Sequence, residues 1–427
     1  MKIDTSISTG NLISLLGIII LVPMLIYPLN SAGSVLMISE FVLVAIAIFL
    51  MVRKINMFVI KEKLVFMWLV TILPVVVNSV SIANKQFGYA FLFISILFFF
   101  LASIQYKGYS FKNLILLIGI LSCIYIFSTI IFSFNLDFGL SKLALLFRSS
   151  IYQGTLGSAG FTSHYSHNSM YIALGTIAWF SFASITKKKV SIVLSLLGIV
   201  AMLFTEKRGP LIALIISMMI AIVIRDKDSF TKKITKYFII GIILLVAIYI
   251  AYLLFPFMFA VLDRFNGNDN MLSNRQYLWQ YAWKSFESSP LFGHGWGYFA
   301  NSLNITVDTV GVSNMNAHNI YLQLLADTGI IGFLIFIVPM IYTLFVSIKL
   351  IRKNINKLLA TELVFSLCFQ IFFLMYGFSG NPLYDRQMFV PYMFSVAITI
   401  YHKVYSKSSG QKVARVNQGE ISAITYR

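Results

Sequence analysis

Charged residues are scarce in this chain. Only 11% of its 427 residues are Asp, Glu, Lys or Arg and 59% are hydrophobic, whereas soluble domains carry about 25% charged residues. This scarcity excludes an ordinary soluble domain and indicates a polytopic membrane protein.

Cysteine is nearly absent as well. Cys123 and Cys368 both fall within apolar runs without any Cys/His spacing, which excludes a disulfide framework and a structural zinc site.

The common catalytic motifs are also missing. The sequence has no HExxH, P-loop, Gly-x-Ser-x-Gly or Rossmann pattern in a credible context. These patterns mark zinc peptidases, nucleotide-binding sites, serine hydrolases and dinucleotide-binding folds. No metal and no other cofactor is therefore indicated, and any chemistry must come from the side chains of the chain itself.

Long apolar runs dominate the sequence. Twelve of them approach the ~20 residues that a helix needs to cross a bilayer. We expect an all-α bundle of about twelve transmembrane helices, forming a single integral membrane domain over residues 1–427. The first run lacks a small-residue cleavage site and another run follows at once, which predicts a retained helix and not a signal peptide. The runs cover residues 12–29, 34–52, 64–83, 88–104, 114–134, 167–185, 190–205, 210–224, 237–258, 330–348, 361–378 and 388–402.

The distribution of positive charge predicts the topology. With the N-terminus in the cytoplasm, 24 of the 33 Lys and Arg residues lie on the inside, and every short inside loop is basic. This bias is the positive-inside rule. The net charge of +18 is thus a topology signal and not a nucleic-acid footprint. We expect both termini in the cytoplasm, with residues 403–427 as a basic, disordered tail, and no nucleic-acid partner.

Three segments on the predicted outer face are longer than tight turns, and they cover 135–166, 259–317 and 379–387. The large loop 259–317 is expected to hold an amphipathic interfacial helix. Ser273 and Gln276 form a capping box, and apolar residues then recur at helical spacing as far as Pro290. A second short helix is expected from His318 to Gly329, with glycine as its C-terminal break.

Two arginines on this face are candidate anion ligands. Arg208 lies in the turn 205–210, where Glu206 is a partner for Lys207 and leaves Arg208 for a ligand. Arg275 falls in the first turn of the predicted helix, where the helix dipole disfavours a cation but free N–H groups favour an anion. A phosphate held by the guanidinium and the helix N-terminus would resolve that conflict. The alternative is a solvated arginine among lipid headgroups.

His318 is the candidate catalytic base. It stands with Asn319 where the large loop re-enters the membrane. A neutral histidine near a bound diphosphate can accept a proton from an attacking hydroxyl, and Asn319 would orient the ring or the hydroxyl. A lone interfacial histidine is the alternative. His164 and His167 either line the same cavity or serve a cap or turn, and His294 sits in a glycine-rich turn suited to a sugar or to a structural role.

The ordered set of motifs resembles the O-antigen ligase/O-antigen polymerase family of bacterial inner-membrane glycosyltransferases. The resemblance covers roughly 205–335 and rests on Arg208 in 205–211, Arg275-x-x-x-Trp279, the segment SPLFGHGWG at 289–297, Ala317-His318-Asn319, and Asp327-Thr328-Gly329. It implies a GT-C helical bundle with its site facing the periplasm or cell exterior. It also implies a donor glycan on undecaprenyl diphosphate, with neither nucleotide nor metal.

The resemblance assigns roles to residues and names partners. By it, Arg208 and Arg275 bind the donor diphosphate, and His318 activates the acceptor hydroxyl for an inverting transfer. Lys207, Asn319, His167 and His294 are secondary candidates. The expected partners are the lipid-linked glycan, an acceptor glycan or lipid A core, membrane lipids, a chain-length regulator and a flippase. A polymerase is favoured over a ligase. A lipid-linked oligosaccharide flippase is disfavoured, because the polar residues gather on one face.

Overall fold

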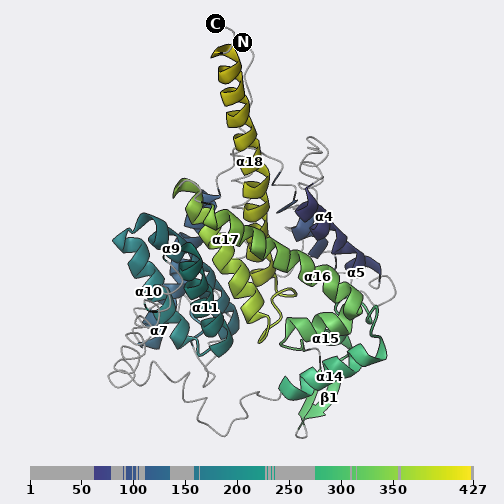
Figure 1. Ribbon diagram of the computed structural model, residues 1–427. Helices are drawn as coiled ribbons and strands as arrows, with labels where there is room; N and C mark the ends of the chain where they lie inside the picture. The colour runs from purple at the N-terminus through teal and green to yellow at the C-terminus, as the bar shows by residue number, and fades with distance from the viewer. Residues whose placement is uncertain are drawn as a thin grey trace, which may run out of the picture.

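The computed structural model shows a bundle of long helices packed side by side (Figure 1). A helical loop region gathers at one end of the bundle, and the chain's last helix projects from the other end. The expected runs 12–29, 34–52 and 237–258, together with Ser273, lie outside the described residues. The structure describes residues 62–77, 90, 93–98, 100–101, 104, 111–134, 158–162, 164–226, 228, 232, 235, 275–307, 310–313, 315–353 and 357–424.

The prediction of an all-α membrane bundle is confirmed. Each expected run within the described residues falls on a helix, and α7, α9, α11 and α16 are long and apolar enough to cross a membrane. The total of twelve spans stays a prediction. The helices are α4 (Lys63–Val70), α5 (Ile72–Val77), α7 (Lys112–Ser133), α9 (Tyr165–Thr186), α10 (Lys189–Phe204), α11 (Arg208–Arg225), α16 (Ile320–Arg352), α17 (Lys357–Tyr376) and α18 (Arg386–Ile424).

The outer surface of the bundle is apolar. Leu196 of α10 and Phe345 of α16 are 57% and 63% exposed, and further large apolar side chains on α7 and α11 are exposed as well. A soluble monomer rarely shows such large apolar patches. On a helical bundle that crosses a membrane, such side chains face lipid, where exposure carries no hydrophobic penalty.

Helix α9 is the centre of the bundle, buried from Asn168 to Phe182. Small residues let its neighbours approach closely. A Cβ added at Gly198 of α10 would lie 2.0 Å from Thr176 Oγ1. Without a hydrophobic driving force between helices in lipid, such close backbone packing supplies the van der Waals contact that holds them together.

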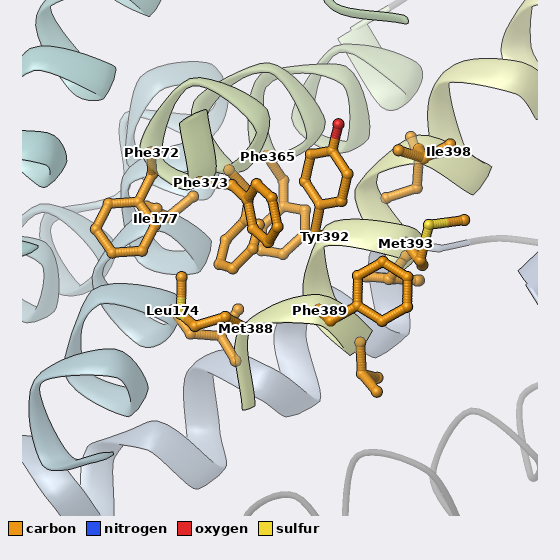
Figure 2. Close-up of a cluster of buried hydrophobic side chains, with 14 of the residues drawn as sticks. Leu174, Ile177, Phe365, Phe372, Phe373, Met388, Phe389, Tyr392, Met393 and Ile398 are labelled. Atoms are coloured by element: carbon orange, nitrogen blue, oxygen red, sulfur yellow. The ribbon is translucent and has the colours of Figure 1, made fainter. Parts of the chain in front are cut away.

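An aromatic and aliphatic cluster joins α9, α17 and α18 (Figure 2). The rings of Phe373 and Tyr392 stack with centroids 3.9 Å apart. Leu174 and Ile177 of α9 lie beside Phe372 of α17. Stacked aromatic pairs add about 0.5–1.5 kcal/mol beyond the area that they bury. The cluster therefore fixes α17 and α18, and with them the turn that connects the two helices, against the central helix.

The two ends of the bundle differ in their polar contacts. At one end, the Glu362 carboxylate accepts from the Lys112 backbone N–H at 3.0 Å and lies 2.8 Å from His402 Nε2. Arg225 Nη2 donates to the Ser184 carbonyl oxygen at this same end. Among the described residues, the lysines and arginines that the sequence predicts to be cytoplasmic lie at this end. We call the opposite end, where α9, α11, α16 and α18 begin and α17 ends, the site end.

The predicted interfacial helix is α14 (Arg275–Ser288), which stops before Pro290. It is amphipathic, since Leu278, Ala282 and Ser285 are buried while Tyr277 and Trp283 are exposed. A short helix, α15 (Tyr298–Ser302), and an antiparallel hairpin of β1 (Asn304–Val307) and β2 (Val310–Ser313) follow. The sequence analysis did not predict this hairpin. Its signal was the β-branched residues of the two segments, which favour strands.

Two further predictions concern helix ends. The expected short helix after His318 starts at Ile320, and Gly329 breaks it with φ 62° and ψ −173°, before α16 continues to Arg352. That prediction is confirmed. The prediction of a disordered tail is wrong as far as Ile424, because α18 continues to that residue. The tail contains no proline, and its Lys, Arg, Gln and Ala residues are good helix formers.

Candidate active site

Arg208 begins a helix at the site end. The turn between α10 and α11 bends at Glu206, whose φ is 53°, and Lys207 then caps α11 with an extended backbone. The next residue, Gly209, lies so close to the turn after α17 that an added Cβ would be 2.2 Å from Ser379 Oγ. The first turn of α11 is thus pressed against Ser379. A helix N-terminus with an arginine as its first residue suits an anion.

Arg275, the first residue of α14, meets the same serine. Its Nη1 donates to the Ser379 carbonyl oxygen at 3.2 Å. Burial lowers the pKa of Arg275 from its ordinary value, although guanidinium groups stay protonated in proteins. Within the described part of the chain, no carboxylate forms a salt bridge with Arg275. A half-buried cation whose partner is neutral is strongly stabilised when an anion binds to it.

His318 completes the cluster of candidate residues. Burial, and then the charges of Arg275 and Lys207, lower the pKa of His318 to about 4. A neighbouring cation disfavours the charged form of the imidazole. The ring is therefore neutral at pH 7 and able to accept a proton. The turn after α17 joins the segments of Arg275 and His318, because its Ser379 and Gly377 carbonyl oxygens accept from Arg275 Nη1 and from Ile320 N–H. The charge of Lys207, the chain neighbour of Arg208, also acts on the imidazole.

The start of α9 places a pair of histidines at the site end. His164 is the N-cap of α9, with its Nδ1 accepting from Ser166 N–H at 3.1 Å, and its ring centroid is 6.0 Å from that of His167. Lys207 Nζ lies 4.1 Å from the centroid of the Tyr165 ring, a cation–π contact. Burial and the Lys207 charge lower the pKa of His164. His164 therefore serves as a cap and also adjoins the candidate site.

The other secondary candidates have structural contacts. His294 Nε2 lies 2.8 Å from Ser288 Oγ and 2.9 Å from the Ser285 carbonyl oxygen, and its ring stacks on Tyr298. These contacts hold the glycine-rich turn to the end of α14. Asn319 Oδ1 accepts from the N–H groups of Tyr321 and Leu322 and so caps the start of α16. Its side-chain oxygen is occupied by the helix.

Asp327 anchors the glycine-rich turn to the bundle. Its carboxylate accepts from Gly297 N–H at 3.0 Å, from Phe299 N–H at 2.8 Å and from Tyr384 Oη at 2.5 Å. Tyr384 also stacks on Trp296, which is 1% exposed. A buried carboxylate is stable only when its oxygens are hydrogen-bonded in this way.

Gly329 packs backbone to backbone against the same turn, and we expect Gly329→Ala to destabilise the protein. A Cβ there would lie 2.4 Å from the Leu291 carbonyl oxygen, and the backbone conformation is nearly exclusive to glycine. Such a conformation costs a residue with a side chain about 1–3 kcal/mol, and the clash adds to that. Thermal unfolding in detergent measures the loss. Leu334→Ala, at a lipid-exposed position of the same helix, is the control, and equal unfolding temperatures would contradict the argument.

Sequence reasoning missed several polar residues that connect these parts. Gln323, Ser379, Asn381 and Tyr384 were not singled out, although the segment 379–387 was expected on the outer face. Their only signal was polarity beside apolar runs. Among the described residues, no group of three or more His, Cys, Asp or Glu side chains is placed to hold a metal ion.

Residues 191–337 match the family described as O-antigen ligase. The match supports an assignment to the O-antigen ligase/polymerase family. Members of this family are glycosyltransferase-like membrane enzymes that act on lipid-linked glycans. The matched region includes Arg208, Arg275 and His318 but ends before the turn between α17 and α18. No curated protein matches the chain.

Proposed function

We propose that this protein is a polysaccharide polymerase of the O-antigen or capsule type. It transfers a glycan from undecaprenyl diphosphate to a sugar hydroxyl of a second lipid-linked glycan, on the outer face of the bacterial inner membrane. The observation that carries the proposal is that one turn, at Gly377 and Ser379, contacts Arg275, the start of α11 and Ile320, two residues after His318. Cations for a diphosphate thus adjoin a neutral base for a hydroxyl.

The chemistry follows from these positions. The acceptor oxygen attacks the anomeric carbon of the donor while its proton passes to the neutral ring of His318. The bond from the anomeric carbon to the diphosphate oxygen breaks, and undecaprenyl diphosphate leaves with the electron pair. Arg208 and Arg275 stabilise the charge that develops on the leaving group. A single displacement of this kind inverts the anomeric configuration.

Reconstitution tests the proposal. The purified protein in liposomes receives an undecaprenyl diphosphate-linked repeat unit as its only substrate. Long lipid-linked products are the expected result. Products that form only after lipid A core is added would instead make the protein a ligase, which is the activity in the matched family's description. Movement of the lipid-linked unit across the bilayer without new glycosidic bonds would make it a flippase.

The pH dependence of transfer tests the role of Lys207. Because kcat/KM reports groups of the free enzyme, its acid limb is expected near the His318 pKa of about 4. Lys207→Gln removes a positive charge that lowers this pKa. The pKa then rises, and the acid limb moves to higher pH. Lys284→Gln, at an exposed position of α14, is the control. An acid limb that stays in place in Lys207→Gln would show that Lys207 does not act on the base.

A further inference from the structure

The turn between α17 and α18, residues 377–385, contacts the three segments that carry Arg208, Arg275 and His318. Its Gly377 carbonyl oxygen accepts from Ile320 N–H at 2.9 Å, two residues after His318. Its Ser379 carbonyl oxygen accepts from Arg275, and the Ser379 side chain lies against Gly209, next to Arg208. This turn lies outside the region matched to the family.

Within the turn, Asn381 reaches a buried glutamine near the candidate base. Asn381 is 4% exposed and Gln323 is fully buried. Asn381 Nδ2 donates to Gln323 Oε1, which also accepts from Ala317 N–H at 3.0 Å. Gln323 Nε2 donates to Asn316 Oδ1 at 3.0 Å. Both ends of the Gln323 amide therefore hold the two residues that directly precede His318.

His318 needs this support because its backbone is strained. Its φ is 52°, in the left-handed region that residues with a side chain rarely adopt. Such a conformation persists only when the surrounding contacts determine it. Trp279 Nε1 donates to the Ala317 carbonyl oxygen at 3.1 Å, so Ala317 is held at both its N–H and its carbonyl group. The Asn319 cap fixes the chain on the other side of His318.

We propose that Gln323 and Asn381 are a pair of positioning residues that hold His318 in place beside Arg275, and that the turn 377–385 is therefore part of the active site. The inference rests on the proposed function, in which His318 accepts the hydroxyl proton. Loss of the Gln323 amide leaves the Ala317 N–H and the Asn381 amide buried without a partner, which is unfavourable for each group. The backbone around His318 then relaxes, and the ring moves.

The test compares Gln323→Leu and Asn381→Ala with Gln370→Leu. Gln370 is a buried glutamine of α17 whose amide bonds Ser347 and Ser366, away from the site. A misplacement of about 1 Å costs about 10²-fold in rate. We expect Gln323→Leu and Asn381→Ala to lower kcat by about this factor while the KM of the lipid-linked donor changes less than about threefold, because the diphosphate ligands remain. Gln323→Glu keeps the acceptor oxygen and is expected to restore part of the rate.

A second measurement, which needs no substrate, reports how accessible the imidazole ring of His318 is. Diethyl pyrocarbonate modifies neutral imidazole, and mass spectrometry of the peptide that contains His318 follows the rate. We expect this rate to rise several-fold in Gln323→Leu and Asn381→Ala and to stay unchanged in Gln370→Leu, because a loosened ring is more accessible. Asn381→Ala removes only one side-chain hydrogen bond, and it is the test variant to use if Gln323→Leu does not fold.

The outcomes separate the two proposals. If the wild-type protein forms no glycosidic bond from the lipid-linked unit, the proposed function fails, and the modification rates still decide the positioning role. If the wild type is active and His318→Ala is not, the proposed function stands. Folded Asn381→Ala with wild-type kcat and an unchanged modification rate would then overturn the positioning role alone.

Discussion

Replacement of His318 by alanine or glutamine is expected to lower kcat by about 10²–10⁴-fold, the range for loss of a general base. Its ring is neutral at pH 7 because burial and two nearby cations lower the pKa of His318 to about 4. Neither replacement side chain can take up a proton from the acceptor hydroxyl, so the attacking oxygen stays a weak nucleophile. The KM of the donor is expected to change little, since the arginines are retained.

The measurement is the initial rate of glycosidic bond formation in liposomes at saturating donor. His402→Gln is the matched control, because His402 is a buried histidine at the opposite end of the bundle, where it pairs with Glu362. Its kcat is expected to equal that of the wild type once the amount of folded protein is matched. A His318→Gln protein that folds and retains its rate would remove the assignment of His318 as the base.

Replacement of Arg275 by alanine is expected to lower kcat/KM by about 10²–10³-fold, the effect of removing one group that stabilises a developing anion. The half-buried guanidinium has the Ser379 carbonyl oxygen as a partner, and its charge helps to lower the pKa of the candidate base His318. Arg275→Lys keeps the charge but loses the planar fork that binds two phosphate oxygens at once. It is therefore expected to recover only part of the activity.

Arg208→Ala is expected to have a similar effect, and the double variant tests whether both arginines bind one diphosphate. Side chains that share a ligand are coupled, so the loss in the double variant should be smaller than the product of the single losses. Initial rates at several donor concentrations supply kcat/KM for each variant. Lys284→Ala, an exposed cation on α14, is the control. Independent, multiplicative losses would mean that the arginines bind separate groups.

Local sequence patterns predicted the parts of the site that depend on nearby residues. The apolar spacing after Arg275 predicted α14, and Gly329 predicted the break in α16, because helix periodicity and a glycine stop act over a few residues. The charge of Arg275 at a helix start pointed to an anion before any neighbour was known. The sequence also placed His318 and both arginines on one face of the membrane, through the positive-inside rule.

Long-range contacts were beyond such patterns. Asn381 meets Gln323 across 58 positions, and Tyr384 meets Asp327 across 57. In the sequence, each of these residues is one polar residue near an apolar run, and nothing local indicates its partner. The hairpin after α15 was missed because each strand has only four residues, too few for an alternating pattern to stand out.

The contact at Ser379 has a consequence for how the sequence of this site can change in evolution. Arg275 binds a main-chain oxygen there, and every amino acid carries that atom. The hold of the turn on Arg275 is thus a property of the path of the chain, and a change of residue type at position 379 leaves this acceptor in place. Homologues without a serine at position 379 can keep this contact, provided that the turn has the same length and that the residues at positions 209 and 379 still fit against each other.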